Sequence, residues 1–555
     1  MKTIPSVSVL LEKVKKSKTN IIVVTGGVCS SIGKGVLVSS IGVLLKNAGY
    51  SLAVCKWDPY LNVDPGTMSP LVHGEVFVTA DGAETDLDLG HYERNIELQV
   101  ERDSSVSSGQ IYQEVLDGER QGVFLGKCIQ LVPHVVDVAK KRLLTFIINH
   151  HADFVLLEIG GTVGDMEGEV FLEAIRQLRM ELGAHRMFHA HLSYVPFLSW
   201  TGEVKTKPTQ HSVIALKRVG LTPDSLVLRA DRAIDVGAVN KLSMMCEVKP
   251  ELIFQMLTFE PTYRIFLDLE KQSVGSKIQQ HFKISPVQKS DLSSWRDFIA
   301  LIDKSKTPVS IGLVAKYVGS NDPYISVVEA IKAAAFHNKH KATIVVIEAE
   351  ELEKDRYGGT NAAWKKLKAL DGIVVPGGFD KRGIEGKIAA ARWAREHKVP
   401  YFGLCLGMQV MVIEGARSLA GLKRANSTEF DPKTTAPVID LMLEQKGVVH
   451  KGGTMRLGGY PCTLVKRTKA YDAYGKDKIV ERHRHRYEVN NAYKKRLEKA
   501  GFVFSGIYKE KDLVEITELK NHPFMLGTQF HPEFQSFPLK VHPLFMAFMK
   551  AVVGK

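Results

Sequence analysis

The chain has 555 residues, too many for a single hydrophobic core, so two or three domains are expected. Its 45% hydrophobic and 24% charged residues are typical of a globular protein, and no apolar run approaches the ~20 residues of a membrane span, so no membrane partner is expected. The net charge of +13 comes from lysines and arginines spread along the chain without aromatic–basic stacking motifs, which favours polyphosphate substrates over nucleic acid.

Residues 1–19 form a leader rich in lysine. Of the first twenty residues, five are lysine and one, Glu12, is acidic. Organelle-targeting peptides favour arginine and serine, so we expect a short amphipathic helix or a disordered leader instead.

Buried-strand patterns define the N-terminal half. Residues 20–25 are a continuous apolar, β-branched run, and residues 36–47 have a helical pattern. Further strands are predicted at residues 51–56, 153–159 and 225–229. Because the first three elements make a βαβ unit, we expect a parallel sheet with helices on both faces in a domain of residues 20–284.

A polar, turn-rich stretch at residues 285–307 contains one short amphipathic segment and is predicted to be a linker. A second series of buried strands follows it, at residues 309–314, 342–347, 372–375 and 399–404. Residues 308–555 are therefore predicted to be a second α/β domain.

A glycine-rich loop at residues 26–35 joins the first strand to the first helix. Such a loop presents backbone N–H groups and a helix N-terminus to phosphates, and Lys34 adds a positive charge. It departs from a strict Walker A loop, because Val28 stands where the first glycine is required and Gly35 replaces the magnesium-binding Ser/Thr. An ordinary tight turn is the alternative, but the Gly-Lys-Gly at a helix start favours phosphate binding.

With Gly35 unable to bind magnesium, carboxylates must supply the ligands. Residues 81–88 are dense in acids, and Glu158 closes a buried strand. Acids at strand ends facing a phosphate loop suit Mg²⁺. Each loop acid could be a solvated side chain, whereas a carboxylate such as Glu158 inside an apolar run requires a reason to be there.

Residues 202–211 combine two lysines, two threonines and a glutamine around Pro208. The lysines suit a triphosphate and the polar side chains suit a base or ribose. A surface loop explains the same composition equally well.

The sequence around Cys405 predicts a nucleophile elbow. Gly403 and Gly407 flank the cysteine at its second neighbours, which suits a sharp strand-to-helix turn that exposes the sulfur. His531 and Glu533 follow later in the chain and supply a base and the group that orients it. The six cysteines are scattered singly, which fits a reducing cytoplasm and a free Cys405. These residues predict acyl transfer through a thiol, as in an amidase or a protease-like hydrolase.

The chain resembles the CTP synthase family over nearly its whole length from about residue 20. The resemblance lies in residues 26–35, 56–68, 73–78, 81–94, 158–165 and 202–211, and in Cys405, His531 and Glu533. It implies a doubly wound, P-loop-like (dethiobiotin-synthetase-like) synthase domain at residues 20–284 and a class I glutamine amidotransferase domain at residues 308–555. The implied reaction is phosphorylation of O4 of UTP by ATP, followed by displacement of the phosphate by ammonia from glutamine, which gives CTP.

The resemblance assigns roles in the synthase domain. The residues that would hold ATP are Ser31, Ile32, Gly33, Lys34, Gly35, Val36 and Asp88. Asp88 and Glu158 would bind Mg²⁺, and Lys56 would lie near the transferred phosphoryl group. The residues that would contact UTP or CTP are Ser30, Asp165, Met166, Glu167, Lys205, Thr206, Lys207, Pro208, Thr209, Gln210 and Lys241.

It also assigns roles in the amidotransferase domain. Cys405 would attack the glutamine amide, with His531 as base and then acid and Glu533 orienting it. The residues that would bind glutamine are Gly378, Leu406, Gly407, Met408, Gln409, Glu429 and Arg486, of which Gly378 and Leu406 would donate to the oxyanion. Residues 452–458 resemble the family's lid. Without the resemblance, the basic run at residues 481–487 would be interpreted as a nucleic-acid patch or a solvated loop.

The resemblance further implies a homotetramer (a dimer of dimers), activation by GTP, feedback inhibition by CTP and an internal ammonia passage, and it leaves filament formation open. The sequence departs from the family at Asp380, where glycine is usual, and in a poor match at residues 257–259, where adenine contacts are expected. Two other classes of protein share part of this pattern. Residues 205–210 disfavour a cobyrinate-type amidating enzyme, and the intact Cys405, His531 and Glu533 disfavour a non-catalytic scaffold.

Overall fold

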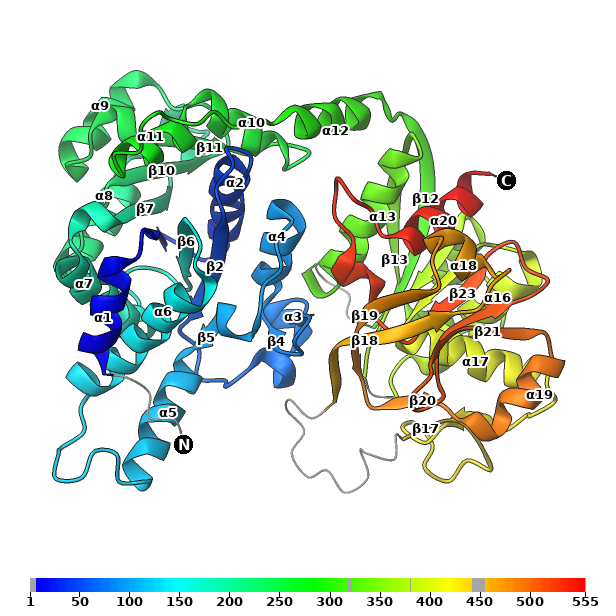
Figure 1. Ribbon diagram of the computed structural model, residues 1–555. Coiled ribbons are helices and arrows are strands. Elements are labelled where there is room, and N and C mark those ends of the chain that lie inside the picture. Colours follow the sequence, from blue (N-terminus) through cyan, green and yellow to red (C-terminus); the bar gives the residue numbers. More distant parts are fainter. Residues whose placement is uncertain (1–5, 317–321, 380, 442–454, 555) are drawn as a thin grey trace. The chain divides into compact units, whose positions relative to one another are not determined.

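The computed structural model describes residues 6–316, 322–379, 381–441 and 455–554. The chain divides into two compact units (Figure 1). The first contains residues Met1–Asp64 and His91–Ile299, and the second contains Pro65–Gly90 and Ala300–Lys555. A short piece of the N-terminal half, Pro65–Gly90, is thus part of the second unit. No described helix is long and apolar enough to cross a membrane.

The first unit is built on a seven-stranded sheet in which all paired strands are parallel, in the order β11-β10-β7-β1-β6-β2-β5. Its strands are β1 (Asn20–Gly27), β2 (Leu52–Asp58), β5 (Ser105–Ser107), β6 (Phe154–Ile159), β7 (Met187–Tyr194), β10 (Ser225–Ala230) and β11 (Ile253–Leu257). The strands predicted at residues 20–25, 51–56, 153–159 and 225–229 are confirmed, because strands buried on both faces are continuous apolar runs in the sequence.

Helices cover both faces of this sheet. On one face Ile21 and Val23 of β1 pack against α6 (Val136–His150) and α7 (Glu169–Leu182). The alternating Ile22 and Val24 are equally buried and point to the opposite face, where α2 (Lys34–Lys46) lies. The remaining long helices are α5 (Ser108–Arg120), α8 (Lys207–Arg218), α9 (Val236–Cys246), α10 (Arg264–Lys271) and α11 (Val274–His281).

The two segments outside the predicted domains each contain one described helix. The described part of the leader is helix α1 (Val7–Lys16), whose Leu10, Leu11 and Val14 are buried against α6 and α7, so the amphipathic alternative holds. The amphipathic segment of the predicted linker is α12 (Ser293–Lys304), and its Trp295 packs edge-on against Phe266 in the first unit. The boundary between the compact units falls inside this helix, after Ile299.

The second unit contains a nine-stranded sheet in the order β13-β12-β14-β15-β23-β22-β21-β18-β19. Neighbours from β13 to β23 are parallel, and those from β23 to β19 are antiparallel. Its strands are β12 (Thr307–Ala315), β13 (His340–Glu348), β14 (Gly372–Val375), β15 (Tyr401–Leu404), β18 (Arg456–Leu464), β19 (Lys478–His485), β21 (Phe502–Tyr508), β22 (Leu513–Leu519) and β23 (Met525–Thr528). The strands predicted at residues 309–314, 342–347, 372–375 and 399–404 are confirmed.

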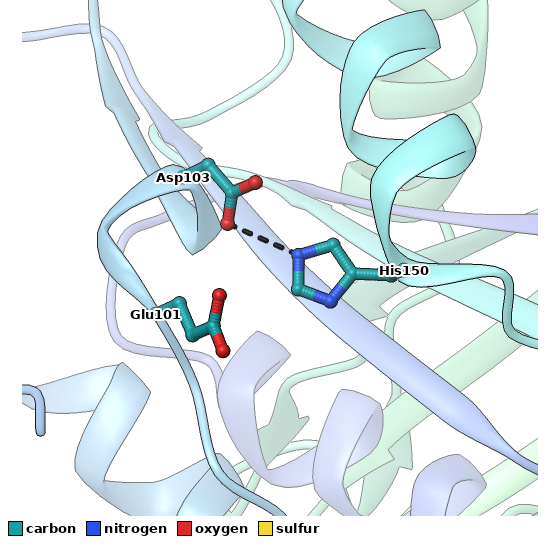
Figure 2. A group of neighbouring side chains, drawn as sticks. All are labelled: Glu101, Asp103 and His150. Carbon is teal, nitrogen blue, oxygen red and sulfur yellow. Dashed lines mark hydrogen bonds and ion pairs between the residues drawn. The ribbon is translucent and has the colours of Figure 1, made fainter. Parts of the chain in front are cut away.

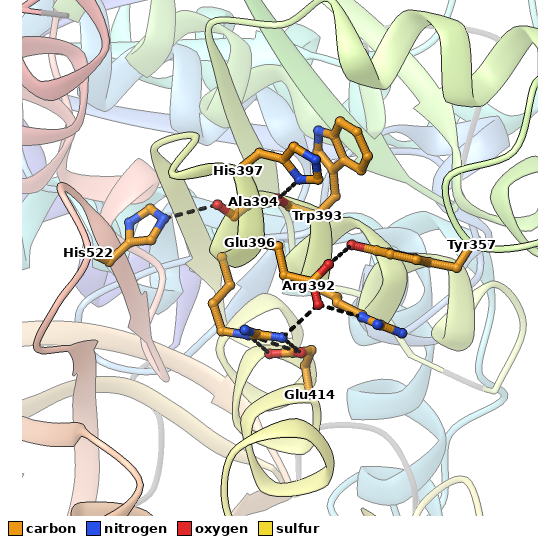
Figure 3. A network of polar contacts seen from close by, with 9 residues as sticks. Tyr357, Arg392, Trp393, Ala394, Glu396, His397, Glu414 and His522 are labelled. Atoms are coloured by element: carbon orange, nitrogen blue, oxygen red, sulfur yellow. Dashed lines mark hydrogen bonds and ion pairs between the residues drawn. The ribbon is translucent and has the colours of Figure 1, made fainter.

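One face of this sheet is covered by α16 (Ile384–His397) and α17 (Leu406–Ser418), and the other by α13 (Ile325–His337) and α20 (Pro543–Val553). Figure 3 shows how the first pair is tied together. Arg395 of α16 and Glu414 of α17 form an ion pair of 2.8 Å, and Glu396 bridges Arg395 to Tyr357. The fold is therefore α/β in both units.

Candidate active sites

Cys405 occupies a strained turn between β15 and α17. Its φ of 52° and ψ of −102° lie outside the regions that L-residues ordinarily adopt. A Cβ at Gly403 would lie 2.5 Å from the carbonyl carbon of Gly407, and a Cβ at Gly407 would lie 2.0 Å from the carbonyl oxygen of Val375. Both glycines are therefore required by close backbone approach, and the predicted elbow is present in the structure.

His531 and Glu533 complete the arrangement. β23 pairs with β15, and His531 follows it in the chain, so both catalytic candidates lie at the same edge of the sheet. Nδ1 of His531 lies 2.7 Å from Oε1 of Glu533, and the ring of Phe534 stacks on the imidazole. The thiol of Cys405 lies 3.8 Å from the carbonyl oxygen of Arg484, to which it donates.

The imidazole of His531 is held in its charged form. Burial opposes the imidazolium, but the Glu533 carboxylate and the Cys405 sulfur outweigh this and raise the pKa of His531 to about 10. A charged imidazole beside a sulfur is the pair that a thiol nucleophile requires.

The loop after β14 lies against this pair. A Cβ at Gly377 would lie 2.9 Å from Cε1 of His531, so the Gly377–Gly378 peptide adjoins the imidazole. Two buried lysines fix the loop from behind: Lys387 donates to the carbonyl of Pro376 at 3.0 Å, and Lys316 donates to that of Phe379 at 2.8 Å. Burial lowers the pKa of Lys387 well below its usual range. These lysines carry no recognisable sequence signal and were not predicted.

Three of the predicted glutamine-binding residues, Gln409, Glu429 and Arg486, lie near Tyr487. Gln409 donates to the carbonyl of Tyr487 at 2.8 Å. Burial raises the pKa of the Tyr487 phenol, the charge of Glu429 adds to this, and that of Arg486 opposes it. Leu406, Gly407 and Met408 form the first turn of α17 and are buried. Asp380 and residues 452–454 of the predicted lid lie outside the described residues.

Residues 481–485 of the basic run form the end of β19 rather than a loop, and Arg486 separates this strand from β20 (Tyr487–Val489). His483 and His485 are buried, and their side chains contact each other at 3.1 Å. The solvated-loop interpretation is therefore wrong for residues 481–485.

In the first unit, the phosphate-loop candidate follows β1. Val28, Ser31 and Gly33 have φ of 80°, 58° and 97°, an irregular backbone that ends where α2 begins at Lys34. Lys34 folds back along Gly26, and its ammonium donates to the carbonyl of Gly161 at 2.6 Å. The loop thus joins the carboxyl ends of β1 and β6, where open α/β sheets bind ligands.

Glu158 lies within β6 and its side chain is buried, in register with Lys56 of β2. The phenol of Tyr92 donates to its carboxylate. Lys56 pairs with the buried Asp58 at 3.4 Å. The carboxylates of Glu158 and Asp58 offer oxygen ligands, which Mg²⁺ prefers. Asp88, expected near a strand end, instead stands in the first turn of α4 (Leu87–Ile96), in the part of the chain that belongs to the second unit.

The predicted nucleotide-binding residues separate into exposed and buried groups. Residues 165–167 and Lys207 and Lys241 are exposed, and Lys205 is half-buried beside Glu203. Thr209 and Gln210, by contrast, are buried in α8 and make internal hydrogen bonds to Ser193 and Thr206. Their side chains are engaged within the unit.

A buried polar chain beneath the phosphate loop was not predicted. Thr25 contacts Nε2 of His189 and Nδ1 of His191 at 2.8 Å each, and His191 contacts the hydroxyl of Ser212 at 2.8 Å. Burial lowers the pKa of both histidines to about 3, so both are neutral. In the sequence they are histidines in an apolar run, and their partners lie far away in the chain.

Glu101, Asp103 and His150 bring three potential metal-ligand atoms together (Figure 2). His150 contacts Asp103 at 3.1 Å, and Glu101 caps the short helical turn that follows it. These contacts within the chain therefore explain why the three side chains lie close together.

Two family models match the chain. Residues 20–284 match the model described as CTP synthase N-terminus, and residues 321–551 match the one described as glutamine amidotransferase class-I. A solved structure of the glutaminase domain of Trypanosoma brucei CTPS with bound acivicin is 37% identical, with a TM-score of 0.41, covering 44% of this chain and 94% of that one.

Curated relatives are similar over both units. The CTP synthase of Caldanaerobacter subterraneus is 50% identical over 536 residues, which is 96% of this chain and 98% of the relative. That of Dehalococcoides mccartyi is 52% identical over 530 residues, 95% of this chain and 96% of the relative. That of Roseiflexus sp. is 51% identical over 531 residues, 96% of this chain and 94% of the relative. From these matches and the two sites described above, this chain belongs to the CTP synthase family.

Proposed function

We propose that this protein makes CTP from UTP, with ATP as phosphoryl donor and glutamine as nitrogen donor. The observation that carries the proposal is the buried contact of Glu533 with His531 beside Cys405 on a strand-to-helix turn, which suits hydrolysis of an amide. Membership of the CTP synthase family supports the transfer of the released ammonia to UTP.

In the second unit, the thiolate of Cys405 attacks the amide carbon of glutamine. The carbon–nitrogen bond breaks as His531 gives its proton to the departing ammonia, and a γ-glutamyl thioester remains. Water activated by His531 then releases glutamate. The N–H groups of Gly378 and Leu406 stabilise the oxyanion, and Gln409, Glu429 and Arg486 hold the amino-acid end of the substrate.

In the first unit, the γ-phosphoryl group of ATP is transferred to O4 of UTP, ammonia attacks C4, and phosphate leaves. Residues 31–36 hold the ATP phosphates, and Lys56 lies near the transferred group. Glu158 would supply an oxygen ligand for Mg²⁺, which when bound neutralises phosphate charge, and the resemblance to the family assigns the same role to Asp88. The site for UTP or CTP is built from Ser30, Asp165, Met166, Glu167, Lys205, Thr206, Lys207, Pro208, Thr209, Gln210 and Lys241. Since Thr209 and Gln210 are buried, their role there is to shape the start of α8.

The proposal includes a cytoplasmic homotetramer, activation by GTP and feedback inhibition by CTP. The family supports these properties. The proposal places the synthase domain at residues 20–284 and the amidotransferase domain at residues 308–555, with residues 285–307 as the linker between them.

A two-donor assay tests the proposal. CTP formation from UTP and ATP is measured with glutamine and then with ammonia. Cys405→Ala should abolish the glutamine reaction and leave the ammonia reaction largely intact. Cys462→Ala, which removes another buried thiol of the same unit, is the matched control and should retain both. Loss of both reactions in folded Cys405→Ala would contradict the proposed division between the units.

A further inference from the structure

The stretch Pro65–Gly90, here the 65–90 segment, is joined at both ends to the first unit but packs on the second. The carboxylate of Glu75 accepts a hydrogen bond from the hydroxyl of Ser326 at the start of α13. The amide of Gly459 in β18 donates to the carbonyl of Ala80 at 2.8 Å. A Cβ at Gly82 would lie 2.8 Å from the carbonyl oxygen of Leu457, so the backbones pack directly together. The segment is therefore closely fitted to the sheet that carries the catalytic residues.

Arg484 of β19 links this segment to the nucleophile. Its Nε lies 2.7 Å from Oε1 of Glu84, and the side chains of the pair are 13% and 1% exposed respectively. Its guanidinium lies 4.8 Å from the ring centre of Phe379, next to Gly378. Its backbone carbonyl accepts the thiol hydrogen bond of Cys405. One residue thus contacts the segment, the candidate oxyanion loop and the sulfur.

Arg482 makes a parallel set of contacts two residues earlier, on the same face of the strand. Its side chain donates to the carbonyl of Val78 at 3.1 Å and lies over the ring of Phe77. Its carbonyl accepts the backbone N–H of His531 at 2.8 Å. Phe77 also packs on Phe534, the ring that stacks on His531. The arginines that the 65–90 segment anchors therefore contact the sulfur of Cys405 and the backbone of His531.

We propose that Glu84 is a positioning residue for glutamine hydrolysis, acting through Arg484 on the sulfur of Cys405. The inference rests on the proposed function. Removing the carboxylate leaves a mostly buried guanidinium without its counter-charge, and such a group moves toward water. The carbonyl of Arg484, which accepts the hydrogen bond of the Cys405 thiol, moves with it, so the orientation of the sulfur changes.

The test is alkylation of Cys405 by iodoacetamide as a function of pH in the full chain, with the Cys405 peptide resolved by mass spectrometry from the exposed Cys29 and Cys128. This readout reports on the thiol without turnover. In Glu84→Gln the alkylation rate at neutral pH should fall by about tenfold, because small displacements at a reacting atom have large kinetic effects. Glutaminase kcat should fall in parallel.

The matched control is Glu414→Gln, which removes an equally buried partner of an arginine in the same unit. Glu414 and Arg395 are 2% and 14% exposed. If Glu84 has only a structural role, both variants should lose stability and keep the wild-type alkylation profile of Cys405. A wild-type alkylation profile in Glu84→Gln would therefore overturn the inference. Glu84→Asp keeps the charge and should give an intermediate profile; it carries the test if Glu84→Gln does not fold. If Cys405→Ala retained glutaminase activity, the proposed function would fail instead.

Discussion

The Glu533 carboxylate lies 2.7 Å from Nδ1 of His531, and this contact fixes which nitrogen of the imidazole faces the substrate. It also stabilises the imidazolium, and with the Cys405 sulfur it raises the pKa of His531 to about 10. The alkaline limit of glutamine hydrolysis should therefore reflect the loss of this proton.

Glu533→Gln should lower the pKa of His531, because the amide keeps a hydrogen bond and removes the charge. The alkaline limb of the pH profile should move to lower pH, and glutaminase kcat/KM should fall by roughly 10²- to 10⁴-fold, as in other triads. Ammonia-dependent synthesis is the internal control. An unchanged pH profile would contradict the role given to Glu533.

Lys387→Met should slow glutamine hydrolysis without affecting ammonia-dependent synthesis. The change removes the donor that holds the Pro376 carbonyl and frees the Gly377–Gly378 peptide to rotate. One lost buried hydrogen bond of ~1 kcal/mol corresponds to a rate loss of about fivefold. Lys398→Met, which removes an exposed lysine donor to the carbonyl of Asn521, is the control and should leave kcat unchanged. Equal rates in the two variants would show that the loop holds its position by itself.

Gly403→Ala should destabilise the second unit, because the added methyl meets the backbone of Gly407 at 2.5 Å. Overpacking of this kind costs about 1–3 kcal/mol. Gly168→Ala adds a methyl with no atom within 4 Å and should leave the melting temperature nearly unchanged. Thermal unfolding compares the two, and equal melting temperatures would mean that the elbow relaxes.

Acid should destabilise the first unit through its neutral buried histidines. His189 and His191 have pKa values of about 3 in the folded chain, below the usual 6.5, so the unfolded chain binds more protons between these values. Their contribution to stability is complete above pH 6.5 and is lost as the pH falls toward 3, at up to ~1.4 kcal/mol per pH unit for each. Hydrogen exchange of the β1 amides measures this. His189→Gln should make the exchange rates less sensitive to acid. An unchanged dependence of the exchange rates on pH would contradict this prediction.

Lys34→Ala should impair CTP synthesis with either nitrogen donor, because its ammonium is the fixed positive charge of the phosphate loop. Glutaminase activity measured alone should survive. Lys46→Ala, which removes the lysine at the other end of α2, where it donates to the carbonyl of Ile96, is the control. If Lys34→Ala lost CTP synthesis from glutamine but kept CTP synthesis from ammonia, the role given to Lys34 in the synthase reaction would be contradicted.

The central strands and the Cys405 elbow could be predicted because their determinants are local. A strand buried on both faces is an unbroken apolar run, and the elbow needs glycines at fixed spacing. The antiparallel strands could not be predicted, since β19 carries arginines and histidines whose burial depends on partners elsewhere. Glu84 stands 400 residues before Arg484, and no local pattern joins them. Lys316 and Lys387, which hold the loop around Gly378, likewise have no recognisable pattern in the sequence.

Asp88, the proposed magnesium ligand, stands four positions after Glu84 in the chain. Glutamine cleaved before an acceptor is ready would waste nitrogen as free ammonia. Under the proposals above, one short stretch of the chain carries both Glu84, which positions the thiol that releases ammonia, and Asp88, which would bind the metal of the synthase reaction, so the two steps depend on the same few peptide bonds.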